Sequence, residues 1–254
     1  MSVIDSIILG IVEGITEFLP ISSTGHLILV SKLLGIEQTD IHKAFEVSIQ
    51  LGSILAVVFL YREKIFHSLD LWKKLIIAFI PTGILGFLLY KIIKSLFSPY
   101  VVSVMLILGG VIFIIIEIFY KEKEHHIDDI GKIPYVKAFL IGVFQSIAMI
   151  PGTSRSGATI IGGLLLGLKR KTAAEFSFLL AVPTMFVATA YDITKNFSSF
   201  QVDDFLTLSV GFITAFIFAV VTIKLFLRFI STHSFIPFGI YRIILGIVFL
   251  LFVL

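Results

Sequence analysis

Two glutamates, a histidine and a group of hydroxyls lie close together in the stretch EGITEFLPISSTGH (residues 13–26). Glu13 and Glu17 are four residues apart, so on a helix they project from one face. Two such carboxylates can hold a divalent cation, particularly where phosphate oxygens complete its coordination shell. Ser23 and His26 would share a face if a helix resumes here, and that arrangement suits a nucleophile and its base.

Each of these side chains also has a structural interpretation. A glutamate in an apolar helix can be protonated or hydrogen-bonded against neighbouring helices. The serines can cap a helix that restarts after Pro20, although capping is compatible with function because free N–H groups at a helix start bind anions. His26 can equally be a buried histidine with both ring nitrogens satisfied.

A second polar stretch, PGTSRSGAT (residues 151–159), interrupts another apolar region. An arginine at this depth needs an anion, and the guanidinium of Arg155 matches phosphate oxygens in pairs. The stretch also supplies hydroxyl donors from Ser154, Ser156 and Thr159. These residues predict a phosphate-binding site. In the alternative interpretation, Arg155 pairs with Glu13 or Glu17 and closes an interface between the two stretches.

Carboxylates, a guanidinium, hydroxyls and an imidazole together are the groups that phosphoryl transfer needs, with positioning and charge stabilisation supplying most of the rate. Glu46 and Glu175 each begin an apolar segment soon after one of the two polar stretches. They are candidates to support the site, but a glutamate at a helix start can also simply satisfy the helix dipole.

The composition is that of an integral membrane protein. Hydrophobic residues make up 57% of the chain, charged residues only 15%, and the mean hydropathy is +1.06. Soluble domains have roughly a quarter of their residues charged. The basic residues lie between apolar segments instead of forming one face, which argues against a nucleic-acid partner. The chain has no cysteine and therefore no disulfide or thiolate site.

The apolar segments predict an all-α polytopic membrane protein. Six are long enough to span a bilayer: 44–60, 75–92, 100–120, 176–191, 206–224 and 238–254. Two further apolar regions, 1–35 and 137–168, are interrupted at Pro20 and Pro151. Interrupted helices are tolerated in a membrane where protein or a polar cavity covers the freed backbone, so we expect two re-entrant helical hairpins.

The two interrupted regions resemble each other, which indicates an internal repeat. GIVEGITEFLPISSTGH (10–26) and GVFQSIAMIPGTSRSGA (142–158) share a glycine, then an acid or amide, a proline and a hydroxyl-rich turn. We expect a first repeat over 1–120 and a second over 137–254, each with one hairpin and three spans, joined by a cytoplasmic linker at 121–136.

An odd number of spans per repeat would invert the second copy relative to the first. With both termini outside, the inner loops hold 13 Lys and Arg and the outer loops hold 5. The positive-inside rule therefore agrees with an inverted repeat. Inverted repeats place their substrate sites near the bilayer midplane, where we expect the two hairpin tips to meet.

At the two polar stretches the chain resembles a known family, the bacterial undecaprenyl-diphosphate phosphatases, also called the bacitracin-resistance protein family. EGITEFLPISSTGH carries its E-x-x-x-E motif and PGTSRSGAT its P-G-x-S-R-S-x-x-T motif. The similarity extends through FEVSIQLGSILAVV and AAEFSFLLAVP to essentially the full chain. The resemblance implies a hydrolase of the bacterial inner membrane that removes the terminal phosphate of undecaprenyl diphosphate, recycles the lipid carrier for cell-wall polymers and counters bacitracin.

The resemblance also implies roles for individual residues and a divalent cation, Mg²⁺ or Ca²⁺, in a cavity that opens to the outer, periplasmic face. Glu13 and Glu17 are similar to the metal or diphosphate–metal ligands, and Glu17 is counted with the catalytic residues. Ser23 and His26 resemble the catalytic hydroxyl and its partner, and the phosphate binders correspond to Ser154, Arg155 and Thr159. We favour attack by Ser23 with His26 as base, while attack by His26 itself or by a metal-bound water stays open.

A transporter is the alternative function, because inverted repeats with broken helices are a carrier architecture and the same anion site could pass a lipid phosphate across the membrane. A nucleophile beside the anion site favours the hydrolase. The expected partners are a prenyl diphosphate lipid and the membrane lipids, with a second copy of the chain in a homodimer as a further candidate and no nucleic acid.

Overall fold

The computed structural model describes residues 1–37, 39–196 and 205–252, and within these ranges every regular element is a helix. The all-α class predicted from composition is thereby confirmed. In chain order the helices are α1 (Val3–Thr16), α2 (Ser23–Leu33), α3 (Asp40–Leu60), α4 (Arg62–His67), α5 (Leu69–Leu88), α6 (Tyr90–Ser95), α7 (Pro99–Phe119), the 3₁₀ turn η1 (Ile130–Lys132), α8 (Tyr135–Ile147), α9 (Arg155–Leu165), α10 (Arg170–Asn196), α11 (Phe205–Ile230) and α12 (Ile236–Phe252).

Several helices are long and apolar enough to cross a membrane. Among the described residues four qualify, namely α5, α7, the Arg170–Ala190 part of α10, and α11. Shorter apolar stretches lie in α3, α8 and α12. Many large apolar side chains on these helices are exposed, as lipid contact requires. The chain is therefore a multi-pass membrane protein.

The helix bounds differ from the predicted spans most clearly for three helices. Helix α10 begins six residues before the span predicted at 176–191 and ends five residues after it, and α11 continues six residues beyond the span predicted at 206–224. The third is the helix predicted at 75–92. The helix starts six residues earlier, at Leu69, because the Ser68 hydroxyl caps it by accepting a hydrogen bond from the Leu71 N–H. It ends at Leu88, and a separate short helix, α6, follows. The end of the span predicted at 238–254 lies outside the described residues, as does most of the outer loop between the spans predicted at 176–191 and 206–224.

Two of the apolar regions contain a break between a pair of short helices. Residues 17–22 separate α1 from α2, and residues 148–154 separate α8 from α9. Each break contains one of the two prolines used to predict it, Pro20 or Pro151. Each ends on a serine with positive φ, Ser22 at 70° and Ser154 at 75°, and these two are the only such non-glycine residues in the described chain.

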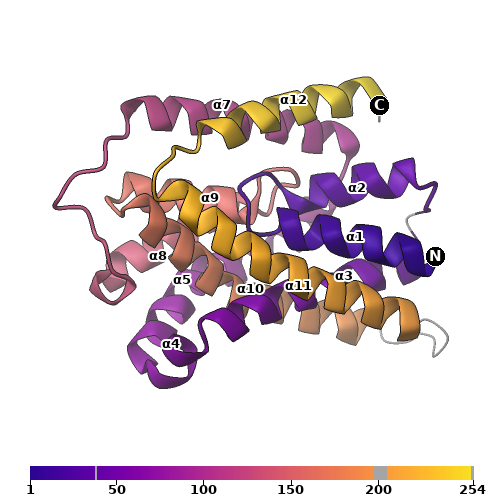
Figure 1. The fold of residues 1–254 in the computed structure, drawn as a ribbon, viewed down its shortest axis with the longest axis horizontal. Helices are drawn as coiled ribbons and strands as arrows, with labels where there is room; N and C mark the ends of the chain where they lie inside the picture. The colour runs from indigo at the N-terminus through magenta and orange to yellow at the C-terminus, as the bar shows by residue number, and fades with distance from the viewer. Residues whose placement is uncertain (38, 197–204, 253–254) are drawn as a thin grey trace.

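The helices pair between the two halves of the chain. The magenta α7 lies alongside the yellow α12, and the orange α11 packs on α1 and α3 (Figure 1). Helix α5 packs on α8, and α10 packs on α3 and α9. Glycines allow this close approach: a Cβ added at Gly14 of α1 would lie 2.5 Å from the Ala215 carbonyl oxygen of α11. The two breaks are held inside this bundle.

Candidate active site

Both helix breaks open onto one cavity of about 280 Å³. Its polar walls come mostly from the breaks themselves and from the helix starts that follow them. The lining residues are Glu17, Ser22, Ser23, Thr24, Gln50, Phe97, Ala148, Met149, Pro151, Gly152, Ser154, Arg155, Met185 and Ala188. The two polar stretches that the sequence singled out are therefore brought together, and the cavity between them has apolar walls as well.

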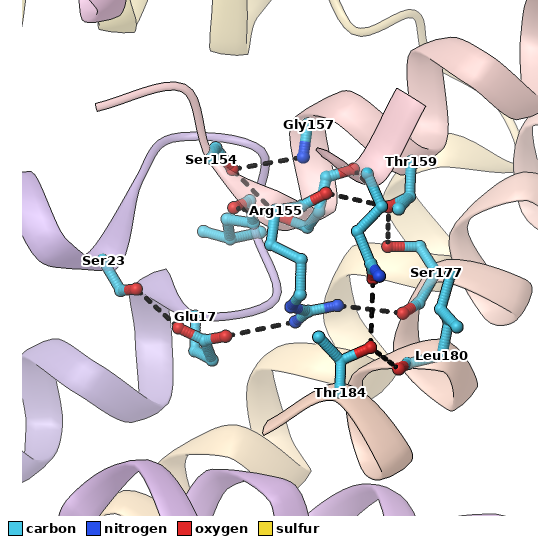
Figure 2. A network of polar contacts seen from close by, with 12 residues as sticks. Glu17, Ser23, Ser154, Arg155, Gly157, Thr159, Ser177, Leu180 and Thr184 are labelled. Atoms are coloured by element: carbon cyan, nitrogen blue, oxygen red, sulfur yellow. Dashed lines mark hydrogen bonds and ion pairs between the residues drawn. The ribbon is translucent and has the colours of Figure 1, made fainter. Parts of the chain in front are cut away.

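Glu17 lies between the first break and the second. Its Oε2 accepts a hydrogen bond from the Ser23 hydroxyl at 2.5 Å, and its Oε1 accepts one from Arg155 Nη2 at 3.1 Å (Figure 2). Arg155 Nη1 also donates to the Ser177 carbonyl oxygen of α10 at 2.9 Å. A carboxylate thus bridges the hydroxyl expected to attack and the guanidinium expected to bind phosphate.

Arg155 is held from several sides while it lines the cavity. It forms the Glu17 ion pair that the alternative interpretation of the sequence predicted, with side-chain exposures of 12% for Arg155 and 6% for Glu17. The guanidinium carbon also lies 5.9 Å from the centre of the Phe18 ring, within cation–π range. Its Nε is buried and has no hydrogen-bond partner among the described residues. Pairing with Glu17 therefore leaves Arg155 with an unused donor.

Glu13 lies one helical turn before Glu17 and is completely buried. Neither of its carboxylate oxygens has a hydrogen-bond partner among the described residues. A buried carboxylate without a partner is costly, and a cation is the partner that would satisfy it. The described side chains hold no group of three or more His, Cys, Asp or Glu around one point. Glu17 lines the cavity and Glu13 does not, so a divalent cation that both carboxylates hold would lie in the cavity wall, with its further ligands supplied by something other than these side chains.

Both nitrogens of His26 have partners other than Ser23. Nδ1 lies 2.8 Å from the Ser22 carbonyl oxygen, and Nε2 lies 2.7 Å from the Tyr241 hydroxyl of α12. Because a carbonyl only accepts, Nδ1 carries the hydrogen, and in the neutral ring Nε2 accepts from Tyr241. His26 shares the helix start with Ser23, as predicted, but the Ser23 hydroxyl bonds to Glu17 instead. His26 is also absent from the cavity lining.

The three predicted hydroxyl donors of the second stretch have different surroundings. Ser154 lines the cavity and caps α9, because its Oγ accepts from the Gly157 N–H at 3.1 Å. Ser156 donates to the Leu19 carbonyl oxygen at 2.8 Å, which ties α9 to the first break. Thr159 donates to the Ser177 hydroxyl at 2.6 Å, which ties α9 to α10 (Figure 2). Only Ser154 is placed to meet a ligand directly.

The two candidate supporting glutamates do not line the cavity. Glu46 pairs with His42, with Oε1 and Nε2 3.1 Å apart. Glu175 lies 3.9 Å from the Lys64 ammonium. The contact with Lys64 gives Glu175 a partner outside the cavity, whereas Glu46 Oε1 is buried and has no hydrogen-bond partner among the described residues.

Several residues around the breaks were not predicted from the sequence. Tyr241 and Arg242 reach them from α12, Ser177 holds Arg155 and Thr159 from α10, and Gln50 lines the cavity from α3. One signal was present: Arg242 is an arginine inside an apolar segment, so the reasoning applied to Arg155 applies to it as well.

Comparisons with known proteins identify the family to which the chain is similar. The family model described as Bacitracin resistance protein BacA matches residues 6–248. An undecaprenyl-diphosphatase of Persephonella marina is 77% identical over the full length of both chains. Proteins of the same name from a Sulfurihydrogenibium species and from Wolinella succinogenes are 69% and 62% identical, over 99% of this chain and 99% and 98% of their own lengths. The chain therefore belongs to the bacitracin resistance protein BacA family.

Proposed function

We propose that the protein is an undecaprenyl-diphosphate phosphatase, which releases the terminal phosphate and regenerates undecaprenyl phosphate for cell-wall synthesis. The observation that carries the proposal is the contact of Ser23 and Arg155 with the two oxygens of Glu17 at one cavity. The names of the full-length relatives support the substrate. Recycling of the carrier would also counter bacitracin, which fits the family description, Bacitracin resistance protein BacA.

In the first step the Ser23 oxygen bonds to the terminal phosphorus while the bond from that phosphorus to the bridging oxygen breaks. The Ser23 proton passes to Glu17, whose Oε2 already accepts it in a 2.5 Å hydrogen bond. Undecaprenyl phosphate leaves. In the second step a water oxygen bonds to the same phosphorus, Ser23 leaves with a proton returned from Glu17, and inorganic phosphate is released.

Charge stabilisation comes from groups already in place around the cavity. Arg155 and the start of α9 present N–H donors and a positive charge to the phosphate oxygens. Ser154 fixes the start of α9 by accepting from the Gly157 N–H. Glu13 and Glu17 would hold the divalent cation, which when bound neutralises charge on the diphosphate.

His26 has a positioning role in this proposal. Its Nδ1–H donates to the carbonyl of Ser22, the residue with positive φ directly before Ser23. This bond would fix the turn that presents the Ser23 hydroxyl. The alternative role of His26 as the base requires Nε2 to leave Tyr241.

We also propose that the two halves are inverted repeats whose breaks are the tips of re-entrant hairpins. Ser22 and Ser154 occupy the same place in the two similar stretches, and both have positive φ. The pairs α7–α12 and α3–α10 each join corresponding helices of the two halves, which an inverted repeat would bring together. We place the protein in the bacterial inner membrane with the cavity open to the periplasm.

Phosphate release from undecaprenyl diphosphate by the purified protein in detergent tests the function. We expect turnover with Mg²⁺ or Ca²⁺, loss with a chelator, and loss in Ser23→Ala and Arg155→Ala. Ser103→Ala is the matched control, because the Ser103 hydroxyl of α7 donates only to the Pro99 carbonyl.

Absence of phosphate release with every divalent cation tested would contradict the hydrolase and favour the transporter. Transport would then be measured as movement of a labelled lipid phosphate across the membrane of proteoliposomes. Light scattering of the same preparation tests the predicted homodimer: two copies per particle would support it, and one copy would contradict it.

A further inference from the structure

Arg242 of α12 is completely buried, and each of its five N–H donors faces a backbone carbonyl. Nε donates to the Leu106 oxygen at 3.3 Å. Nη1 donates to Pro20 at 3.0 Å and Thr153 at 2.9 Å. Nη2 donates to Met105 and Gly152, both at 3.0 Å. The hydrogen-bonding capacity of the guanidinium is thereby used completely.

These five carbonyls belong to three separate parts of the fold. Pro20 lies in the first break, Gly152 and Thr153 lie in the second, and the other two belong to α7. One side chain from α12 therefore joins both breaks to each other and to a continuous helix. Among the described residues Arg242 forms no ion pair with a carboxylate, so carbonyl dipoles alone accept its hydrogen bonds.

The neighbouring helix is shaped to receive this guanidinium. An added Cβ at Gly109 of α7 would lie 2.1 Å from Arg242 Nη2, and one at Gly110 would lie 3.2 Å from Arg242 Cβ. Any side chain at Gly109 would force the guanidinium to move. The two glycines therefore allow α12 to come close enough for the arginine to reach the breaks.

The positions that Arg242 holds are next to the catalytic groups. Thr153 directly precedes Ser154 and Arg155, and Pro20 lies shortly before Ser22 and Ser23. Carbonyls in a helix break have no intrahelical partner, and inside a membrane protein they need one. A fixed carbonyl at each break limits the directions in which the following helix start can point.

We propose that Arg242 is a positioning residue for the phosphatase site, which sets the two breaks at the spacing that lets Glu17, Ser23 and Arg155 meet. The expected loss of kcat rests on the proposed function, whereas the expected change in the spacing of the two breaks does not. A lysine at 242 keeps the charge but has only three donors on one atom, so it cannot hold all five carbonyls.

The test uses Arg242→Lys in a chain that has no native cysteine. Nitroxide labels on Ile15→Cys and Ile147→Cys, exposed positions near the two breaks, report their separation by double electron–electron resonance. We expect Arg242→Lys to broaden the distance distribution and to lower kcat for phosphate release at least tenfold, at substrate concentrations that saturate the variant.

Gly246→Ala is the matched control, because it disturbs the same pair of helices away from the breaks. The added Cβ would lie 2.6 Å from Ile107 Cγ1 and 2.9 Å from the Ser103 carbonyl oxygen of α7. We expect a lower thermal midpoint with the distance distribution and kcat of the wild type. If Arg242→Lys does not fold, Gly109→Ala carries the test, since it keeps Arg242 and displaces its guanidinium.

The proposal would be overturned if Arg242→Lys and Gly109→Ala both keep the wild-type distance distribution. A fall in kcat together with the thermal midpoint would then reflect a packing defect only. Absence of phosphate release from the wild-type protein would instead overturn the proposed function, and the distance measurement would still decide whether Arg242 sets the spacing of the breaks.

Discussion

Glu17 and Arg155 are 138 residues apart in the chain, yet Oε1 of the carboxylate and Nη2 of the guanidinium are 3.1 Å apart. The pair connects the end of α1 to the start of α9 across the cavity (Figure 2). Because both side chains are largely buried, neither charge is well solvated if its partner is removed. The ion pair therefore fixes the orientation of both side chains and also keeps both of them charged.

Arg155→Lys should lower kcat by about 10²–10³-fold, the cost of losing one fixed donor to a developing charge. Lysine keeps the charge, but one ammonium cannot reproduce the planar guanidinium that contacts both Glu17 and the Ser177 carbonyl. Phosphate release by purified variants measures the effect. Arg62→Lys is the control, because Arg62 is exposed and should change the rate less than twofold. If Arg155→Lys and Arg62→Lys release phosphate at equal rates, Arg155 has no role in the active site.

Glu13→Gln should uncouple cation binding from stability. The amide removes a buried charge with no hydrogen-bond partner among the described residues, so in chelator the thermal midpoint should rise above that of the wild type. Added Mg²⁺ or Ca²⁺ should stabilise the wild type, by about 2.7 kcal/mol at a hundredfold excess over Kd, and leave Glu13→Gln unchanged. Differential scanning fluorimetry gives both midpoints.

Glu63→Gln, an exposed substitution, should respond to the cation like the wild type. A Glu13→Gln protein with undiminished cation stabilisation would show that the ion binds elsewhere.

Much of the fold was predictable because its signals are local. The length of the apolar segments predicted the helices. Pro20 and Pro151 predicted the interruptions, because proline fixes φ and has no backbone N–H to donate. Glu13, Glu17 and Arg155 stood out because charge in an apolar segment is costly wherever it lies. The contacts between these residues were less predictable, because they depend on how distant helices pack.

His26 illustrates this limit. Its spacing from Ser23 placed both on one helix start, but its Nε2 partner, Tyr241, is 215 residues away. Likewise Ser156 and Thr159 belong to the motif, yet they bond to Leu19 and Ser177. Helical periodicity predicts the face of the helix on which a residue lies, but not which distant residue packs against that face. Arg242 lies in a segment predicted to span, and only the bundle reveals which carbonyls it reaches.

The same substitution at the two serines with positive φ should have unequal effects on stability. Ser154→Ala removes the cap on the Gly157 N–H and should lower the free energy of unfolding by about 1 kcal/mol. Ser22 makes no such cap, so Ser22→Ala should change it by less than about 0.5 kcal/mol. Ser22→Gly should be at least as stable as the wild type, because glycine adopts positive φ without strain. Thermal unfolding of the three variants measures the order, and a less stable Ser22→Gly would contradict it.

The orientation of the protein in the membrane gives a prediction for labelling. The start of α1 and the end of α12 lie at one end of the molecule, and α4 and the segment before α8 lie at the other (Figure 1). In the cysteine-free chain, a membrane-impermeant maleimide added to intact cells with a permeable outer membrane should label Lys94→Cys and not Lys123→Cys. Both positions are exposed, and both should react after lysis. The reverse pattern would place the N-terminus inside.

The role of His26 can be separated by two amides that imitate different ring nitrogens. If His26 acts by donating from Nδ1 to the Ser22 carbonyl, His26→Ala should lose at least tenfold in kcat and His26→Asn should recover part of it. The Asn amide nitrogen occupies the Nδ1 position, whereas the Gln amide nitrogen in His26→Gln approximates Nε2, beside Tyr241.

A base at Nε2 predicts another order, because no amide can accept a proton at neutral pH: His26→Asn and His26→Gln should then be as inactive as His26→Ala. Tyr241→Phe adds an independent measurement, since it frees Nε2. It should raise or preserve kcat if Nε2 is the base. If the two side chains instead act through one hydrogen bond that holds the turn before Ser23, Tyr241→Phe should lower kcat. The double variant with His26→Ala should then be no slower than His26→Ala alone.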